Sequence, residues 1–146
     1  MKKIKFEITT PERKVYSQEV DQVTIPTVQG EITVLPGHIP LVSAVLPGEL
    51  RTVKDGEEAI FAIAGGFIEV LPDKVTILAD SAEYAEEIDE KRAEEAKARA
   101  EKLLSEKRFD SEEFAALSAQ IERELVRIKV AKKKKYRNLP NQPLDK

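Results

Sequence analysis

The sequence of 146 residues contains no cysteine and only one histidine, His38. Without cysteine the chain cannot form a disulfide framework, a thiolate zinc site or an iron–sulfur cluster, and it offers no thiol nucleophile. A single histidine provides too few ligands for a multi-histidine metal site and only one candidate base for a serine-type relay. We therefore expect that the chain is not an enzyme and has no metal-ligating side chains.

Long apolar runs are also missing. No segment approaches the roughly 20 consecutive apolar residues that a membrane-spanning helix needs. The alternating polar and apolar residues at 1–11 do not form the apolar run of a secretory signal. The formal net charge of −3 is too small to predict a nucleic-acid or lipid partner. These features predict a cytosolic protein that reaches a membrane only through a partner.

Residues 84–137 lack both glycine and proline, whereas all six glycines and six of the eight prolines precede them. Charged residues number 21 among the first 83 positions and 30 among the following 63. Punctuation by glycine and proline is typical of strands and turns, and an uninterrupted charged stretch is typical of helix. We predict a strand-rich domain at 1–84, a helical domain at 85–137 and a disordered tail at 138–146.

In the first domain, runs rich in β-branched residues recur about every eight to twelve residues between Gly, Pro and Asp, which predicts antiparallel strands in a sandwich or barrel. Residues 59–64 are apolar on both faces, so this part of the sheet should be covered by another element. Residues 54–56 and 71–74 are predicted hairpin turns. Gly65-Gly66 lies between two strands, which favours a bulge or close strand contact over a phosphate-binding loop.

In the second domain, apolar residues fall at helical spacing in two groups separated by a short break. The groups are Ala85, Ile88, Ala96, Ala100 and Leu103, and then Phe114, Leu117, Ile121, Leu125 and Ile128. Asp110 or Ser111 can cap the second helix, and so short a connection predicts an antiparallel α-helical hairpin. Because the inner face of the first helix is mostly alanine, its packing should be weak and conditional.

The helical domain carries arginines at spacings that place them on common helix faces: Arg92 and Arg99 follow Asp89 on the first helix, and Arg123 and Arg127 lie on the second. If the two faces met, four guanidiniums and one carboxylate could hold a polyphosphate through bidentate hydrogen bonds, with the acid accepting from a base's amino group. The alternative is ion pairing along each helix, worth a few tenths of a kcal/mol (~0.2–0.5) per pair. The candidate pairs are Asp89–Arg92, Glu95–Arg99 and Glu124–Arg127. Spacing alone favours the ion pairs.

Two further features are candidates for partner contacts. His38 lies in a proline-flanked turn, where it could contact a partner or satisfy a local backbone group, and no catalytic companion is evident for it. The cationic run at 132–135 could be a solvated helix end favoured by the helix dipole, or a docking patch for an acidic protein surface or nucleic acid. The sequence leaves these alternatives open.

The chain resembles a known family along nearly its whole length. The residues that carry the resemblance are TVQGEITVLPGHIPLVSAVLPGELR (27–51), AIAGGFIEVLPDKVTILAD (62–80) and IDEKRAEEAKARAEKLL (88–104). They resemble the epsilon subunit of the bacterial F-type rotary ATP synthase, whose mitochondrial counterpart is called delta. The resemblance implies a β-sandwich of about ten strands on the central stalk, followed by a mobile helical hairpin. Residues 138–146 lie beyond it.

By this resemblance the protein would couple rotation and inhibit ATP hydrolysis through its hairpin, with ATP, with or without Mg²⁺, as a regulatory ligand that favours the folded hairpin. Its partners would be the gamma subunit, the c-ring and the beta and alpha subunits, at the cytoplasmic face of the plasma membrane, peripherally. The nucleotide-binding residues would be Glu83, Ile88, Asp89, Arg92, Ala93, Arg99, Arg123 and Arg127. The partner-contact residues would be Glu31, His38, Lys132, Lys133, Lys134 and Lys135. The alternatives are a structural coupler without nucleotide sensing, and an enzyme that uses His38.

Overall fold

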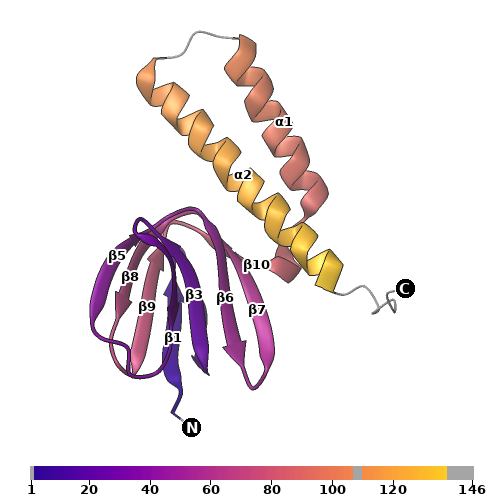
Figure 1. Ribbon diagram of the computed structural model, residues 1–146. Coiled ribbons are helices and arrows are strands. Elements are labelled where there is room, and N and C mark those ends of the chain that lie inside the picture. The colour runs from indigo at the N-terminus through magenta and orange to yellow at the C-terminus, as the bar shows by residue number, and fades with distance from the viewer. Residues whose placement is uncertain (1, 107–109, 138–146) are drawn as a thin grey trace, which may run out of the picture.

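The computed structural model describes residues 2–106 and 110–137, and of residues 135–137 it describes the backbone alone. The predicted tail at 138–146 lies outside the described residues. A strand-rich part and a pair of long helices follow one another along the chain, and the helices project from one edge of the strands (Figure 1).

The strand-rich part is a ten-stranded sheet that curls around one core. The strands are β1 (Ile4–Thr9), β2 (Lys14–Val20), β3 (Gln22–Thr27), β4 (Gly30–Val34), β5 (Leu41–Val45), β6 (Gly48–Lys54), β7 (Glu57–Ile63), β8 (Gly66–Val70), β9 (Lys74–Ala79) and β10 (Ala82–Tyr84). Their order is β10-β7-β6-β3-β5-β8-β9-β1-β2, and β4 pairs with β3. The predicted sandwich is confirmed, with one local departure: β1 and β9 run parallel, whereas we expected only antiparallel pairs.

Side-chain alternation explains how these strands enclose a core. In β1, Ile4, Phe6 and Ile8 are fully buried while the residues between them face outward. Strand β7 is the exception, because four consecutive residues, 60–63, are buried. Phe61 and Ile63 point into the sandwich, and Ile60 and Ala62 pack on the other side against the helical part. The cover predicted over residues 59–64 is therefore confirmed.

Glycine fixes the tight turns and one close strand contact. Asp55 and Gly56 form the two-residue turn between β6 and β7, with φ of 51° and 81°, as the two-residue hairpin turn requires. Gly66 has φ +145°, and a Cβ there would lie 2.1 Å from the carbonyl oxygen of Leu78. The predicted close contact at the diglycine is confirmed, since β8 and β9 approach one another there without room for a side chain.

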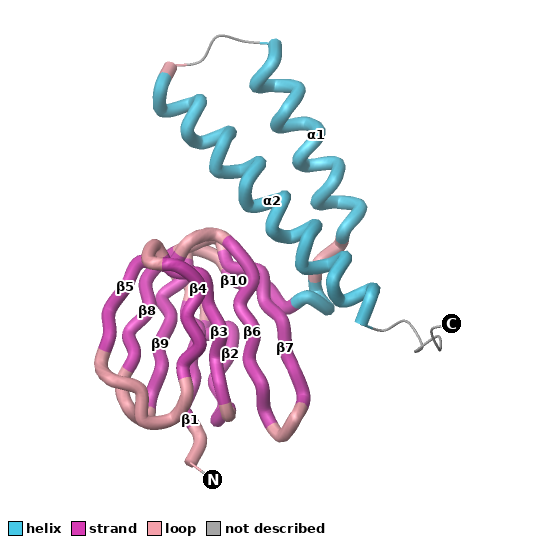
Figure 2. The backbone as a smooth tube through the Cα atoms, viewed as in Figure 1, coloured by secondary structure: helices cyan, strands magenta, loops and turns pink. Residues whose placement is uncertain are grey.

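The helical part begins with the short 3-10 helix η1 (Ala85–Glu87) and continues with α1 (Glu90–Glu106) and α2 (Ser111–Arg137). The backbone N–H of Glu113 donates to Asp110 Oδ1 at 2.8 Å, so Asp110 is the cap of α2. The two helices lie side by side and form the predicted antiparallel hairpin, confirming the fold class (Figure 2).

The hairpin buries little apolar surface. In α1 only Ala93 and Ala100 are buried, and the predicted inner residues Leu103, Phe114 and Leu125 are 44%, 54% and 45% exposed. The predicted stripe is therefore wrong for these three residues. Leu103 lies near the end of α1 and Phe114 near the start of α2, at the end of the hairpin that projects away from the sandwich (Figure 1). Leu125 lies farther along α2, which changes partner along its length, so that its C-terminal part packs on the sandwich around Val130.

Candidate functional site

A cavity of about 250 Å³ lies where α2 crosses the edge of the sandwich. Its walls come from β7 and β10 on one side and from α2 on the other. The lining residues are Ala62, Ile63, Ala64, Ser81, Glu83, Arg123, Glu124, Val126 and Arg127. Because both parts of the molecule contribute, a ligand in this cavity would contact the sandwich and the hairpin together.

Arg127 is the centre of the cavity's charge network. Its Nε donates to Glu83 Oε2 at 2.8 Å, and its Nη1 donates to Glu124 Oε2, also at 2.8 Å. Burial tends to lower the pKa of Arg127, but the hydrogen bonds and charges of the two carboxylates outweigh burial and raise this pKa above its usual value. Arg127 thus stays charged and joins β10 to α2.

Three of the eight predicted nucleotide-binding residues, Glu83, Arg123 and Arg127, line this cavity. Within the described part of the chain, no carboxylate pairs with Arg123. Two arginines and two glutamates make the lining neutral in formal charge. The cavity therefore offers one unpaired guanidinium and one that already has two partners.

Three other predicted nucleotide-binding residues, Asp89, Arg92 and Arg99, lie at the start of α1 or within it and do not line the cavity. Asp89 Oδ1 accepts a hydrogen bond from the backbone N–H of Arg92 at 3.1 Å and so caps α1. The side chain of Arg92 is 84% exposed and lies 3.9 Å from Asp89 Oδ2. Arg99 is exposed as well, and neither arginine lines the cavity. The four guanidiniums do not converge in this arrangement.

The two remaining predicted residues serve packing. Ala93 is fully buried in the hairpin, and the half-buried Ile88 packs against the small cluster that includes Ala85 and Val130. Of the three ion pairs considered along the helices, Asp89–Arg92 and Glu124–Arg127 are present. Glu95 and Arg99 form no ion pair in the described part of the chain.

The sequence analysis missed Ser81, Val126 and above all Glu124 as cavity residues. Glu124 is 4% exposed, although it lies on a helix rich in charged residues. Its only signal in the sequence was the spacing of three residues to Arg127, which indicates an ion pair but not burial. Burial arises because the edge of the sandwich covers this turn of α2, and no local pattern reports that contact.

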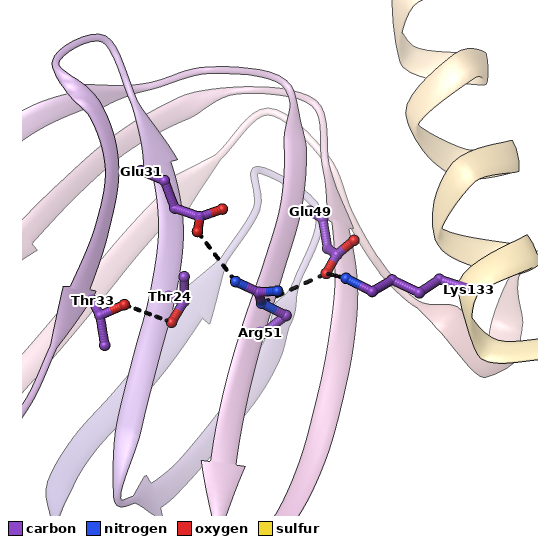
Figure 3. Close-up of polar contacts among 6 residues, drawn as sticks. All are labelled: Thr24, Glu31, Thr33, Glu49, Arg51 and Lys133. Carbon is purple, nitrogen blue, oxygen red and sulfur yellow. Dashed lines mark hydrogen bonds and ion pairs between the residues drawn. The ribbon is translucent and has the colours of Figure 1, made fainter. Parts of the chain in front are cut away.

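The basic end of α2 is tied to the sandwich by a row of charged side chains, drawn in Figure 3. Lys133 Nζ donates to Glu49 Oε1 at 2.6 Å, Arg51 Nε lies 3.6 Å from the same oxygen, and Arg51 Nη2 donates to Glu31 Oε1 at 3.2 Å. Two predicted partner-contact residues, Glu31 and Lys133, are therefore linked through β6. Lys132 is exposed and Lys134 half-buried, and the side chain of Lys135 lies outside the described residues.

His38 lies in the loop between β4 and β5. Its Nδ1 is 2.6 Å from the carbonyl oxygen of Ile39, and since a carbonyl only accepts, Nδ1 must carry the hydrogen. This is the local backbone contact that the sequence left as one alternative. Ile39 itself is 75% exposed, and the N–H of Gly37 donates to the carbonyl of Pro72, which fixes the loop beside the β8–β9 turn.

An exposed apolar surface crosses the outer face of β5, β8 and β9. Val42, Phe67 and Leu78 are 72%, 61% and 58% exposed and line one shallow pocket. Phe67 stands directly opposite Leu78 in the strand register. A contiguous apolar surface of this kind is typical of a protein–protein contact.

The described residues contain neither a membrane-spanning helix nor a metal-binding cluster. No described helix is long and apolar enough to cross a membrane. The same residues contain no group of three or more histidine, cysteine, aspartate or glutamate side chains that could hold a metal ion.

Known proteins match the chain over both of its parts. The ATP synthase delta/epsilon chain β-sandwich domain matches residues 3–85, and the long α-helix domain of the same family matches residues 86–132. The ATP synthase epsilon chain of Herpetosiphon aurantiacus is 48% identical over 92% of this chain and 98% of its own length. That of Syntrophobacter fumaroxidans is 50% identical over 90% and 97%.

Solved structures agree with these matches. A chain in the mitochondrial ATP synthase of Euglena gracilis, solved with its F1 part and c-ring, superposes with a TM-score of 0.71 at 26% identity, covering 84% of this chain and 77% of that one. A chain of the Tetrahymena thermophila central stalk and c-ring shares the fold at 17% identity, with a TM-score of 0.61 over 90% and 99%. The resemblance noted in the sequence is confirmed, and the chain belongs to the ATP synthase delta/epsilon chain family.

Proposed function

We propose that this protein is a non-catalytic central-stalk subunit of a rotary ATP synthase whose hairpin inhibits ATP hydrolysis when it leaves the sandwich. The observation that carries the proposal is the small contact between the two parts. The hydrophobic cluster between the hairpin and the sandwich contains four buried residues, which are Ile60, Ala62, Ala85 and Val130. So small an apolar contact can be exchanged for contacts with another protein.

We propose that ATP favours the folded arrangement by binding in the cavity between β7, β10 and α2. A ligand held by Glu83 of the sandwich and by Arg123 and Arg127 of α2 would bind only while these residues lie together. Such a ligand stabilises the folded arrangement in proportion to its differential affinity. Arg92 and Arg99 would reach the phosphates only after their exposed side chains turn toward the cavity.

Partner contacts are proposed for three surfaces. The apolar surface of Val42, Phe67 and Leu78 suits the gamma subunit, and the segment of Glu31 and His38 suits the loops of the c-ring. The basic end of α2, Lys132–Lys135, suits an acidic surface of a beta or alpha subunit. These contacts would place the protein at the cytoplasmic face of the plasma membrane without insertion.

Reconstitution of the ATP synthase with two variants tests the inhibitory role. Truncation after Glu87 removes α1 and α2, and we expect faster ATP hydrolysis. Val130→Asp places a charge in the small apolar contact and should release the hairpin, so we expect slower hydrolysis than with the unchanged chain. If neither variant changes the rate of hydrolysis, the hairpin is not inhibitory.

The second candidate is a structural coupler that does not sense nucleotide. The ion pairs Arg127–Glu83 and Lys133–Glu49 favour it, because both hold α2 on the sandwich without any ligand. Thermal unfolding separates the two functions: ATP at 100 times its dissociation constant should add about 2.7 kcal/mol of stability if it binds. An unchanged melting temperature in millimolar ATP would favour the coupler.

A further inference from the structure

Two of the five N–H donors of Arg127 are already bonded to carboxylates. A phosphate held in bidentate fashion needs two neighbouring guanidinium nitrogens, either Nε with Nη2 or Nη1 with Nη2. Glu83 takes Nε, and Glu124 takes Nη1, each at 2.8 Å. Each pair of donors therefore includes one nitrogen that is already bonded to a carboxylate.

The two carboxylates differ in how they are held. Glu83 lies on β10, its side chain is 38% exposed, and it reaches Arg127 only while α2 rests on the sandwich. Glu124 lies one helical turn before Arg127 on α2 itself, and its side chain is 6% exposed. Because Glu124 and Arg127 lie on the same helix, their contact does not depend on the contact between α2 and the sandwich.

The position of Glu124 works against an anionic ligand. Its charge lies in the cavity wall, where burial leaves it less screened by solvent than a surface charge. A polyphosphate that grips Arg127 must displace this carboxylate or approach it closely, and like charges a few ångströms apart repel each other.

We propose that Glu124 is a built-in competitor for the phosphate groups of the ligand, and that its contact with Arg127 sets how tightly the cavity binds a nucleoside triphosphate. The inference rests on the proposed nucleotide site and adds a residue that weakens binding there. The ligand chemistry is that of a polyphosphate. Because Glu124 lowers the affinity of the cavity for it, a high concentration of the ligand is needed to fill the cavity.

Calorimetric titration of the full chain tests the proposal, with ATP and with inorganic tripolyphosphate as separate ligands. The variant is Glu124→Gln, which keeps the size of the side chain and removes its charge. The matched control is Glu122→Gln, which removes an equal charge from an exposed position on the same helix. We expect ATP to bind Glu124→Gln about tenfold or more tightly than the unchanged chain, equivalent to about 1.4 kcal/mol, and Glu122→Gln within about twofold.

A merely structural role for Glu124 gives the opposite result, because loss of its contact would weaken ATP binding together with the melting temperature. Equal or weaker ATP binding by Glu124→Gln, when the unchanged chain does bind ATP, overturns the inference and leaves the nucleotide site intact. Binding by Glu124→Gln alone supports the inference. If neither protein binds ATP, the nucleotide site and the inference both fail.

Tripolyphosphate separates the phosphate grip from base recognition. The same gain in affinity for tripolyphosphate supports an action of Glu124 on the phosphates, whereas a gain confined to ATP contradicts it. Should Glu124→Gln fail to fold, as judged by thermal unfolding, Glu124→Ala is titrated in its place with the same expected tightening.

Discussion

Strand β7 contributes to two apolar clusters of very different size. On its inner side, Phe61 and Ile63 join a core that draws on all ten strands. On its outer side, Ile60 and Ala62 form a small cluster of buried residues with Ala85 and Val130, and the partly buried Ile88 and Val126 pack against this cluster. The same strand thus contributes to a large core and to a small contact, and we predict that the small contact opens at a lower cost in free energy than the core.

The sharpest test of this difference is Phe61→Ala. Phe61 is fully buried. The centroid of its ring lies 4.4 Å from the ring centroid of Tyr84 and 5.2 Å from that of Tyr16. We expect a loss of about 3–5 kcal/mol in the free energy of unfolding, measured by chemical denaturation. The control is Phe67→Ala, which removes the same side chain from an exposed position and should cost less than about 0.5 kcal/mol. Similar losses in both variants would contradict a core confined to the inner side.

The next effect concerns the backbone of the sandwich. Gly66→Ala would place a Cβ 2.1 Å from the carbonyl oxygen of Leu78, so β8 and β9 must separate. We expect a loss of about 2 kcal/mol or more in the free energy of unfolding. The control is Gly37→Ala, because nothing lies within 4 Å of the Cβ that this substitution adds. Only the backbone strain at φ +84° remains there, and we expect it to lower the free energy of unfolding by about 1 kcal/mol. An equal loss in both would mean that strain, not crowding, governs Gly66.

On the outer side of β7, Val130→Ala should loosen the hairpin and leave the sandwich intact. The substitution removes two buried methyl groups from the small cluster, which costs about 1–2 kcal/mol. Hydrogen exchange should therefore become faster in η1 and in the C-terminal half of α2, and stay unchanged in β1 and β9. Leu125→Ala is the control, since Leu125 is 45% exposed. Faster exchange throughout the sheet would show that the two clusters form one unit.

The sequence predicted the elements whose causes are local. β-branched runs between Gly, Pro and Asp predicted the strands, residues 54–56 predicted the turn between β6 and β7, and Asp110 or Ser111 was the predicted cap of α2. It also indicated that residues 59–64 are covered on both sides, because a strand with one wet face would alternate. Each of these features depends on neighbours within a few residues or on a simple period.

The rest depends on contacts between distant parts of the chain. A single helical stripe placed Leu125 inside, but α2 packs first on α1 and then on the sandwich, so its buried face shifts along the helix. Glu124 is buried for the same reason. Spacing alone favoured ion pairs along each helix over a convergence of Arg92 with Arg127, and the side chain of Arg92 is 84% exposed. The nucleotide-binding set stays a prediction, and the contact between Lys133 and Glu49, 84 residues apart, left no pattern to find.

The smallest expected effect is on the ion pair at the basic end of α2. Lys133 Nζ lies 2.6 Å from Glu49 Oε1, with side chains 43% and 14% exposed. Because the Lys133 side chain is partly exposed, we expect this ion pair to contribute up to about 1 kcal/mol to the attachment of α2 and to weaken as the salt concentration rises. We expect Lys133→Gln to speed hydrogen exchange at the end of α2 slightly at low ionic strength, and to have no effect near 1 M salt.

A double-mutant cycle with Glu49→Gln isolates the pair, and Lys129→Gln serves as the control for charge because Lys129 has no ion-pair partner among the described residues. A coupling energy that vanishes with salt means that screening alone loosens this end of the hairpin while the apolar cluster around Val130 still holds. A coupling energy of zero at low salt would mean that the pair Lys133–Glu49 does not stabilise the contact of α2 with the sandwich. The apolar cluster around Val130 and the hydrogen bonds of Arg127 would then account for that contact.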